Sequence, residues 1–240
     1  MQIGRWAGAC TLVYMFALNP VAARPILYAH STTVMAEYCE DTMKDIQVSY
    51  APTHFMAFGL GHLELDGGGP GAEHEINFAR LNLLAKRWNL EAAQSNIFIW
   101  GGAGRSTLTI APDAVDSGGH NHGGPVLPGQ AAVFNETAGN AGGQIDYETR
   151  RIFTSFATDA HFSSTFTHRM DTLQFGIAPY KHEANGLATW LVISATHFSG
   201  NVQPEETQVS LLLRLFKRFT WIEAGATTDG KPQVRLMLTF

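Results

Sequence analysis

Two short stretches carry the residue types of an activated nucleophile. In TDAHFSS, Asp159, His161 and Ser163 alternate along the chain, and in ATHFSGN, His197 and Ser199 repeat the His-x-Ser spacing. An acid, an imidazole and a hydroxyl can together activate a serine for attack on an acyl ester. Residues two apart in a strand share one face and lie about 6.6 Å apart at Cα. The spacing therefore predicts catalysis only where rotamers bring the Ser and His side chains together.

An ordinary place at the rim of a sheet is the alternative for both stretches. His197 shares its parity with Leu191, Ile193 and Ala195, which predicts that its side chain points toward lipid. A His-x-Ser pair on one strand resembles the arrangement in membrane-embedded lipid hydrolases of the outer membrane. That resemblance implies phospholipid or lipid A deacylation as a hypothesis for this chain.

Two groups of residues could bind a metal ion. SGGHNHGGP places His120 and His122 two residues apart, with Asp113 and Asp116 nearby. Imidazoles at this spacing can hold Cu²⁺ or Zn²⁺ weakly, and the alternative is a solvated loop.

The second metal-binding candidate is a soft-ligand group near the N-terminal part of the chain. It consists of Met35, Cys39 and Met43, together with His30. The alternative is that these sulfur-containing residues are apolar strand residues.

The elements that must position these residues are strands, because apolar residues recur with period two. In TQVSLLLRLFK, Val209, Leu211 and Leu213 alternate with Ser210 and Arg214. The sequence predicts twelve strands, with ten as the alternative, at about 32–40, 45–51, 54–65, 75–88, 95–105, 139–150, 151–162, 166–180, 187–198, 206–216, 218–227 and 232–240. A long loop is predicted at about 106–138.

Charges of both signs occupy the polar parity of these strands. They are Arg80, Lys86, Asp146, Glu148, Arg150, Arg214, Glu223 and Arg235. A barrel in hydrocarbon has a polar interior and an apolar outer band, and strands in lipid must close into a barrel because no water satisfies an open edge. The pattern thus predicts an all-β, closed antiparallel transmembrane β-barrel, with a periplasmic β-sandwich or soluble barrel as the alternative. The inward charges would line a narrow selective path or pair with one another structurally.

The first 23 residues have the features of a secretory signal peptide. Arg5 supplies a positive n-region, residues 6–18 form an apolar h-region, and Val21-Ala22-Ala23 is a small-residue cleavage site. The prediction is cleavage after Ala23, which leaves 24–240 as the barrel; an uncleaved anchor is the alternative.

Composition limits the partners and cofactors. Charged residues make up 15% of the 240 residues, the net charge is −5, and the mean hydropathy is −0.04. This mildly acidic chain has no basic stripe, so nucleic acid is excluded as an expected partner. No phosphate loop, dinucleotide fingerprint or closed zinc cage is present in the sequence, so no cofactor is predicted.

The last nine residues, PQVRLMLTF, alternate in polarity and end on Phe240. A terminal strand ending in Phe resembles the assembly signal of bacterial outer-membrane barrels. The blocks IQVSYAPTHFMAFGLGHLEL, YETRRIFTSF, FGIAPY and WIEAGATTDG resemble an uncharacterised family of small bacterial outer-membrane proteins. The resemblance implies the outer membrane as the location, and lipids and the barrel-assembly machinery as partners. The expected function is a narrow channel or a structural envelope component, with a lipid hydrolase and a copper- or zinc-associated envelope protein as alternatives.

Overall fold

The computed structural model describes residues 28–66, 72–110, 132–181 and 186–240. Every regular element in these ranges is a β-strand, and none of the described residues forms a helix that could span a bilayer. The twelve strands are β1 (Ser31–Cys39), β2 (Met43–Thr53), β3 (Met56–Asp66), β4 (Ala72–Asn89), β5 (Ala93–Ile110), β6 (Ala132–Thr149), β7 (Ile152–Phe162), β8 (Thr167–Ile177), β9 (Ala188–Gly200), β10 (Glu206–Lys217), β11 (Thr220–Thr227) and β12 (Pro232–Thr239). The predicted signal peptide, 1–23, lies outside the described residues.

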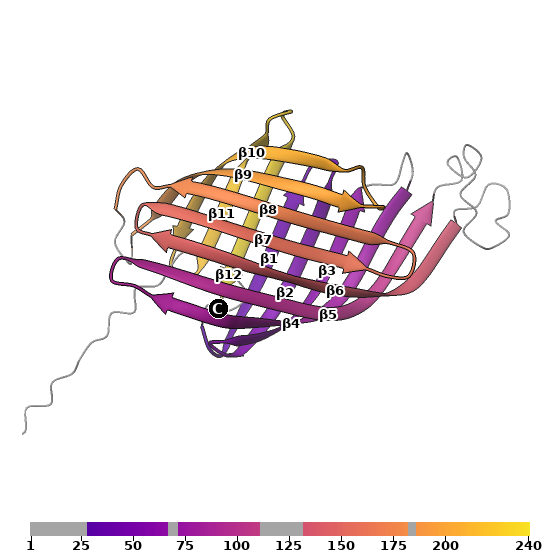
Figure 1. Cartoon of the computed structure of the whole chain (residues 1–240), viewed down its shortest axis with the longest axis horizontal. Coiled ribbons are helices and arrows are strands. Elements are labelled where there is room, and N and C mark those ends of the chain that lie inside the picture. Colours follow the sequence, from indigo (N-terminus) through magenta and orange to yellow (C-terminus); the bar gives the residue numbers. More distant parts are fainter. Residues whose placement is uncertain (1–27, 67–71, 111–131, 182–185) are drawn as a thin grey trace, which may run out of the picture.

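The strands form one closed antiparallel barrel (Figure 1). Each strand pairs with its neighbours in the chain, and β12 pairs with β1 to close the sheet, with Thr239 opposite Thr33 and Arg235 opposite Glu37. Backbone bonds continue the seam to Phe240, whose N–H donates to the Thr32 carbonyl at 2.9 Å. The prediction of a closed twelve-stranded barrel is confirmed, and ten strands is wrong.

Side chains alternate between the lumen and the outer surface along each strand. In β9, Leu191 and Ile193 are 47% and 53% exposed, whereas Val192 and Ser194 are at most 1% exposed. Large apolar side chains cover the outside in this way on all parts of the barrel wall, and polar side chains are buried within. An apolar exterior around an interior that buries many polar and charged side chains differs from a soluble domain and fits hydrocarbon as solvent.

The two ends of the barrel differ in their connections. Both described chain ends lie at one end, the turn end, which carries the connections 54–55, 90–92, 150–151 and 218–219, each of two or three residues, and the longer connection 178–187. The opposite end, the loop end, carries 40–42, 67–71, 111–131, 163–166, 201–205 and 228–231. Four of the five turn-end connections have two or three residues, and every loop-end connection has three or more.

Three strands, β4, β5 and β6, are 18 residues long each and extend past their neighbours. β7 pairs with β6 only from Gly139 onward, so the first part of β6 projects beyond the wall at the loop end (Figure 1). The predicted loop at 106–138 is therefore too long. β5 continues to Ile110 and β6 starts at Ala132, because these stretches pair with each other.

The lumen is filled in layers. Near the turn end, a turn-end core contains Phe153, Ala178, Ala188, Trp190, Val192, Leu212, Phe216, Trp221 and Met237, with Ala51, Ala57 and Phe98 as a smaller group. Near the loop end, a loop-end core contains Cys39, Met43, Leu63, Leu65, Ile76, Phe78, Ala138, Phe166, Phe198 and Val202. Charged and amide side chains lie between the two cores.

Candidate functional site

A row of charges with alternating sign crosses four neighbouring strands inside the barrel. Arg214 on β10 lies opposite Glu223 on β11, Glu223 lies opposite Arg235 on β12, and Arg235 lies opposite Glu37 on β1. Each neighbour in the row is an ion pair: Arg214 to Glu223 at 2.8 Å, Arg235 to Glu223 at 3.5 Å and Arg235 to Glu37 at 2.6 Å. The row places each charge beside one of opposite sign.

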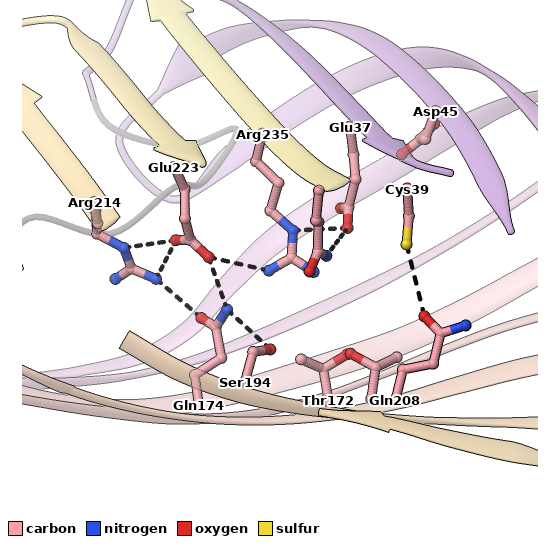
Figure 2. Close-up of polar contacts among 12 residues, drawn as sticks. Glu37, Cys39, Asp45, Thr172, Gln174, Ser194, Gln208, Arg214, Glu223 and Arg235 are labelled. Carbon is pink, nitrogen blue, oxygen red and sulfur yellow. Dashed lines mark hydrogen bonds and ion pairs between the residues drawn. The ribbon is translucent and has the colours of Figure 1, made fainter. Parts of the chain in front are cut away.

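Gln174 on β8 adds an amide group beside the Arg214 end of this row (Figure 2). Its amide nitrogen donates to Glu223 and to the Ser194 hydroxyl, each at 3.4 Å, and its oxygen accepts from Arg214 at 3.0 Å. Ser194 on β9 is the direct cross-strand partner of Gln174, whereas the bonds to Arg214 on β10 and Glu223 on β11 pass over intervening strands on the lumenal side. Glu223 is 0% exposed and Arg214 is 2% exposed, so the pair is sequestered from solvent.

Arg80 on β4 forms the second half of the interior network. Its guanidinium donates to Asp159 on β7 at 3.1 Å and to Gln47 on β2, and Gln47 in turn donates to Asp45. β4 and β7 are not neighbours in the sheet, so the Arg80–Asp159 pair bridges the interior. We call these residues and the Arg214 row together the lumenal charge network.

Aromatic rings flank both buried guanidinium groups. Arg80 lies 5.2 Å from the centroid of Phe78 and 5.4 Å from that of Trp100, and Arg214 lies 4.4 Å from Phe153 and 5.2 Å from Trp221. Cation–π contacts of this kind gain strength when they are desolvated. The rings occupy the volume beside the charges that water would otherwise fill.

Lys86 was expected in the lumen, and the structure corrects this. The pairing of β4 with β5 shifts between Leu84 and Lys86, a β-bulge, and a one-residue shift exchanges the two faces of a strand. Lys86 is consequently exposed and lies 5.8 Å from the ring of Trp88. Arg87 points inward instead and donates to Asn96 at 2.7 Å.

Arg150 is the second expected lumenal charge that lies elsewhere. β6 ends at Thr149, and Arg150 is an exposed residue of the β6–β7 turn. Asp146 and Glu148, before it on β6, are buried at 3% and 6% exposure. Asp146 accepts a hydrogen bond from Asn96 at 2.8 Å, which connects it to the inward-facing Arg87.

The Asp159, His161 and Ser163 group is divided between the lumen and a turn. His161 is 2% exposed, and its Nε2 lies 3.7 Å from Asp159. Ser163 follows the end of β7, where its hydroxyl accepts from the backbone N–H groups of Thr165 and Phe166 at 3.1 Å. The serine oxygen is thus engaged in a turn, and the catalytic assignment stays a prediction.

His197 and Ser199 lie on the outer side of β9, with the parity expected for a lipid-facing pair. Nδ1 of His197 is 2.9 Å from the Thr207 hydroxyl, and Nε2 is 3.5 Å from Glu205. Both ring nitrogens therefore have partners other than Ser199 in this structure. Hydrolysis by this pair also stays a prediction.

A buried polar row crosses β6, β7 and β8 below the loop end. Asn140 lies opposite His161, and His161 lies opposite His168. In the described part of the chain, the Asn140 amide, Nδ1 of His161 and Nε2 of His168 have no hydrogen-bond partner. Within the same described residues, no three His, Cys, Asp or Glu side chains are arranged to hold a metal ion.

The two predicted metal groups have different outcomes. His120 and His122 lie outside the described residues, so that site stays a prediction. The soft-ligand group is split, because Met35 packs against the turn-end core while Cys39 and Met43 face each other in the loop-end core. His30 is far from both sulfurs, since its N–H bonds Ala51 at the turn end.

The sequence prediction did not single out several members of the network. Glu37, Asp45 and Gln174 were not proposed, although each has the parity of an inward residue within an alternating stretch. The signal was present in VMAEYC and KDIQVSY, where the polar residues alternate with Val, Ala, Ile and Tyr. Their partners across the lumen have no signal in one sequence, because they belong to strands far apart.

Comparison with known proteins gives similarity of architecture alone. No family model and no curated protein matches the chain. Similar solved structures include LpxR from Salmonella typhimurium, with 10% identity, a TM-score of 0.43 and coverage of 88% of this chain and 99% of that one. The N-terminal β-barrel domain of Pseudomonas aeruginosa OprF has 9% identity, a TM-score of 0.35 and coverage of 88% and 98%. OmpT, an outer membrane protein of Vibrio cholerae, has 6% identity, a TM-score of 0.34 and coverage of 88% and 96%. These identities and TM-scores are too low to assign an activity to this chain. Its resemblance to an uncharacterised family of outer-membrane proteins stays a prediction.

Proposed function

We propose that this chain is an outer-membrane β-barrel with a closed lumen, and that it serves the envelope as a structural component rather than as a diffusion channel. The closed sheet and its apolar outer surface support a place in a lipid bilayer. Bacterial outer membranes are where single-chain antiparallel barrels with an even strand number occur.

The observation that carries the closed lumen is the pairing within the lumenal charge network. A conducting path needs continuous water, or ligands that replace the hydration shell of the ion. Here the charged groups in the middle of the barrel bind one another, as Glu223 does with both Arg214 and Arg235. Both carboxylate oxygens of Glu223 are engaged in this way within the protein, so little of their hydrogen-bonding capacity is available to a passing ion.

The apolar cores on either side of the network add a second barrier. Trp190 and Trp221 of the turn-end core are 1% and 4% exposed, and Phe198 of the loop-end core is 5% exposed. An ion would have to cross both apolar layers without water, at a large desolvation cost. A narrow channel would require these layers to be hydrated, and their burial does not favour that.

Electrical recording from planar bilayers tests the proposal. The barrel is purified in detergent, its fold is verified by heat-modifiable migration on gels, and its insertion is verified by protection from protease. We expect no conductance steps in membranes that contain folded barrels, while a general porin added afterwards shows that open barrels are detected. Discrete ohmic steps from the folded wild-type protein would overturn the closed lumen.

A further inference from the structure

A small cavity of about 60 Å³ lies inside the barrel next to the β1–β2 turn. Three of its lining residues carry sulfur: Cys39, Met43 and Met170. The other residues around it include Gln208 and Arg235. A volume of this size holds more than one water molecule, so it accommodates a bare metal ion.

The three sulfur side chains come from opposite parts of the wall. Cys39 and Met43 are direct cross-strand partners at the tip of the β1–β2 hairpin. Met170 belongs to β8, which is separated from β1 by four strands in the sheet order. It packs against the same loop-end core that contains Cys39 and Met43. The group therefore exists only in the closed barrel.

Gln208 fixes the polar side of this cavity (Figure 2). Its amide nitrogen donates to the Thr42 hydroxyl at 3.1 Å, and its oxygen accepts the weak hydrogen bond of the Cys39 thiol at 3.6 Å. The oxygen is thus directed at the sulfur. If the thiol loses its proton, the thiolate and this oxygen repel each other unless a cation lies between them.

We propose that the cavity binds one soft monovalent ion, Cu(I) or Ag(I), through the Cys39 thiolate and the Met43 and Met170 thioethers. Thiolate and thioether ligands select soft ions such as Cu(I). Binding requires the thiolate, so the thiol proton leaves to solvent as the ion enters. The charge of the cavity does not change in this exchange.

The charge balance is the reason for a monovalent ion. Arg235 lines the cavity and is already paired with Glu37, which also lines it, at 2.6 Å. A divalent ion would add an uncompensated positive charge beside Arg235, and such charges are costly in a buried place. Zn²⁺ also prefers four His, Cys or carboxylate ligands, and no three of these are suitably arranged in the described residues.

Metal titration with matched variants tests the site. Ag(I) serves as the redox-stable probe and Cu(I) under reductant as the second, each competed against a chromogenic chelator, with the folded barrel in detergent. A Cys10→Ser background leaves Cys39 as the one thiol, because the chain has two cysteines. A His120→Ala/His122→Ala background removes the predicted loop site. We expect one ion per barrel in this background.

The variants separate ligands from neighbours. Cys39→Ser should weaken binding by more than about 100-fold, beyond the range for losing an outer-shell partner. Met43→Leu and Met170→Leu, which conserve volume, should each weaken it by at least about tenfold. Met35→Leu is the control, because Met35 lies on the same strand as Cys39 but packs against the turn-end core.

Two results would overturn the site: no bound ion in the folded barrel, or equal affinity in wild type and both Met→Leu variants. Heat-modifiable migration verifies that each variant is folded, and the Met→Leu pair remains informative if Cys39→Ser does not fold. The outcome is independent of the closed lumen, since conductance and metal affinity are measured separately.

Discussion

Removing the charge of Glu223 should lower the free energy of unfolding of the barrel more than removing the charge of an exposed carboxylate does. Glu223 is 0% exposed and bonds both Arg214, at 2.8 Å, and Arg235, at 3.5 Å. Glu223→Gln keeps the shape of the side chain but removes its charge. Arg214 then loses the carboxylate with which it pairs and stays buried, with Gln174 and two aromatic rings as neighbours, whereas Arg235 keeps its pair with Glu37.

The expected loss of stability depends on how deeply the ion pair is buried and not on the distance between its charged atoms. Removing one partner of a buried ion pair costs about 3–5 kcal/mol, because the other charge remains desolvated. The exposed pair Lys44–Glu64 is equally short, at 2.7 Å, but its side chains are 54% and 26% exposed. Exposed pairs contribute about 0.2–1 kcal/mol, so Glu64→Gln is a control of matched geometry.

The assay is reversible unfolding in lipid vesicles by urea, followed by tryptophan fluorescence. We expect Glu223→Gln to lower the free energy of unfolding by at least about 2 kcal/mol more than Glu64→Gln does. A double variant, Arg214→Met/Glu223→Leu, should regain part of the loss, since replacing both members of a buried pair by apolar groups is often neutral. Equal effects of Glu223→Gln and Glu64→Gln would mean that the lumenal pair is hydrated, and the argument for a closed lumen would fail.

Two further matched pairs test the wall of the barrel by the same unfolding assay. A Cβ at Gly102 would lie 2.0 Å from the Ala79 carbonyl oxygen, whereas at Gly101 the nearest such contact is 3.7 Å; Gly102→Ala should cost about 1–3 kcal/mol or more and Gly101→Ala little. Similar effects of the two substitutions would contradict this close approach of β5 to β4. Arg87→Ala should cost about 1.5–3 kcal/mol, because Arg87 bonds inside the barrel, and Lys86→Ala less than about 0.5 kcal/mol. A larger loss of stability for Lys86→Ala than for Arg87→Ala would contradict the position of the β-bulge between Leu84 and Lys86.

Most of the fold could be predicted from the sequence because one physical rule acts on nearly every residue. A wall with lipid outside and protein inside imposes period two over each strand, and this fixed the number of strands and the face of Arg214 and Glu223. The same parity also places Trp190 inside, with Val192 and Ser194. The position of Trp190 near a strand end would instead suggest an aromatic residue at the membrane interface. Parity is therefore the better guide to the position of this side chain.

The bulge beside Lys86 could not be predicted, because nothing in LNLLAKRW marks the residue at which the pairing shifts. The contacts between side chains across the lumen could not be predicted from the sequence either. Arg80 and Asp159 are brought together by the curvature of the closed sheet, and a single sequence contains no measure of it. Alternation determines which face a side chain occupies, and closure determines which partner it finds there.

The position of the charge row suggests why a barrel keeps ions in its interior when apolar residues would often serve stability equally well. Arg235 lies at the seam, opposite Glu37 on β1 and Glu223 on β11. A slip of one residue between β12 and β1 would turn every side chain to the wrong face. A slip of two residues would keep the faces but place Arg235 opposite Met35 or Cys39, where its charge loses the carboxylate across the seam. Apolar side chains could not distinguish these registers so sharply, so we infer that the alternating charges define the register at which the sheet closes.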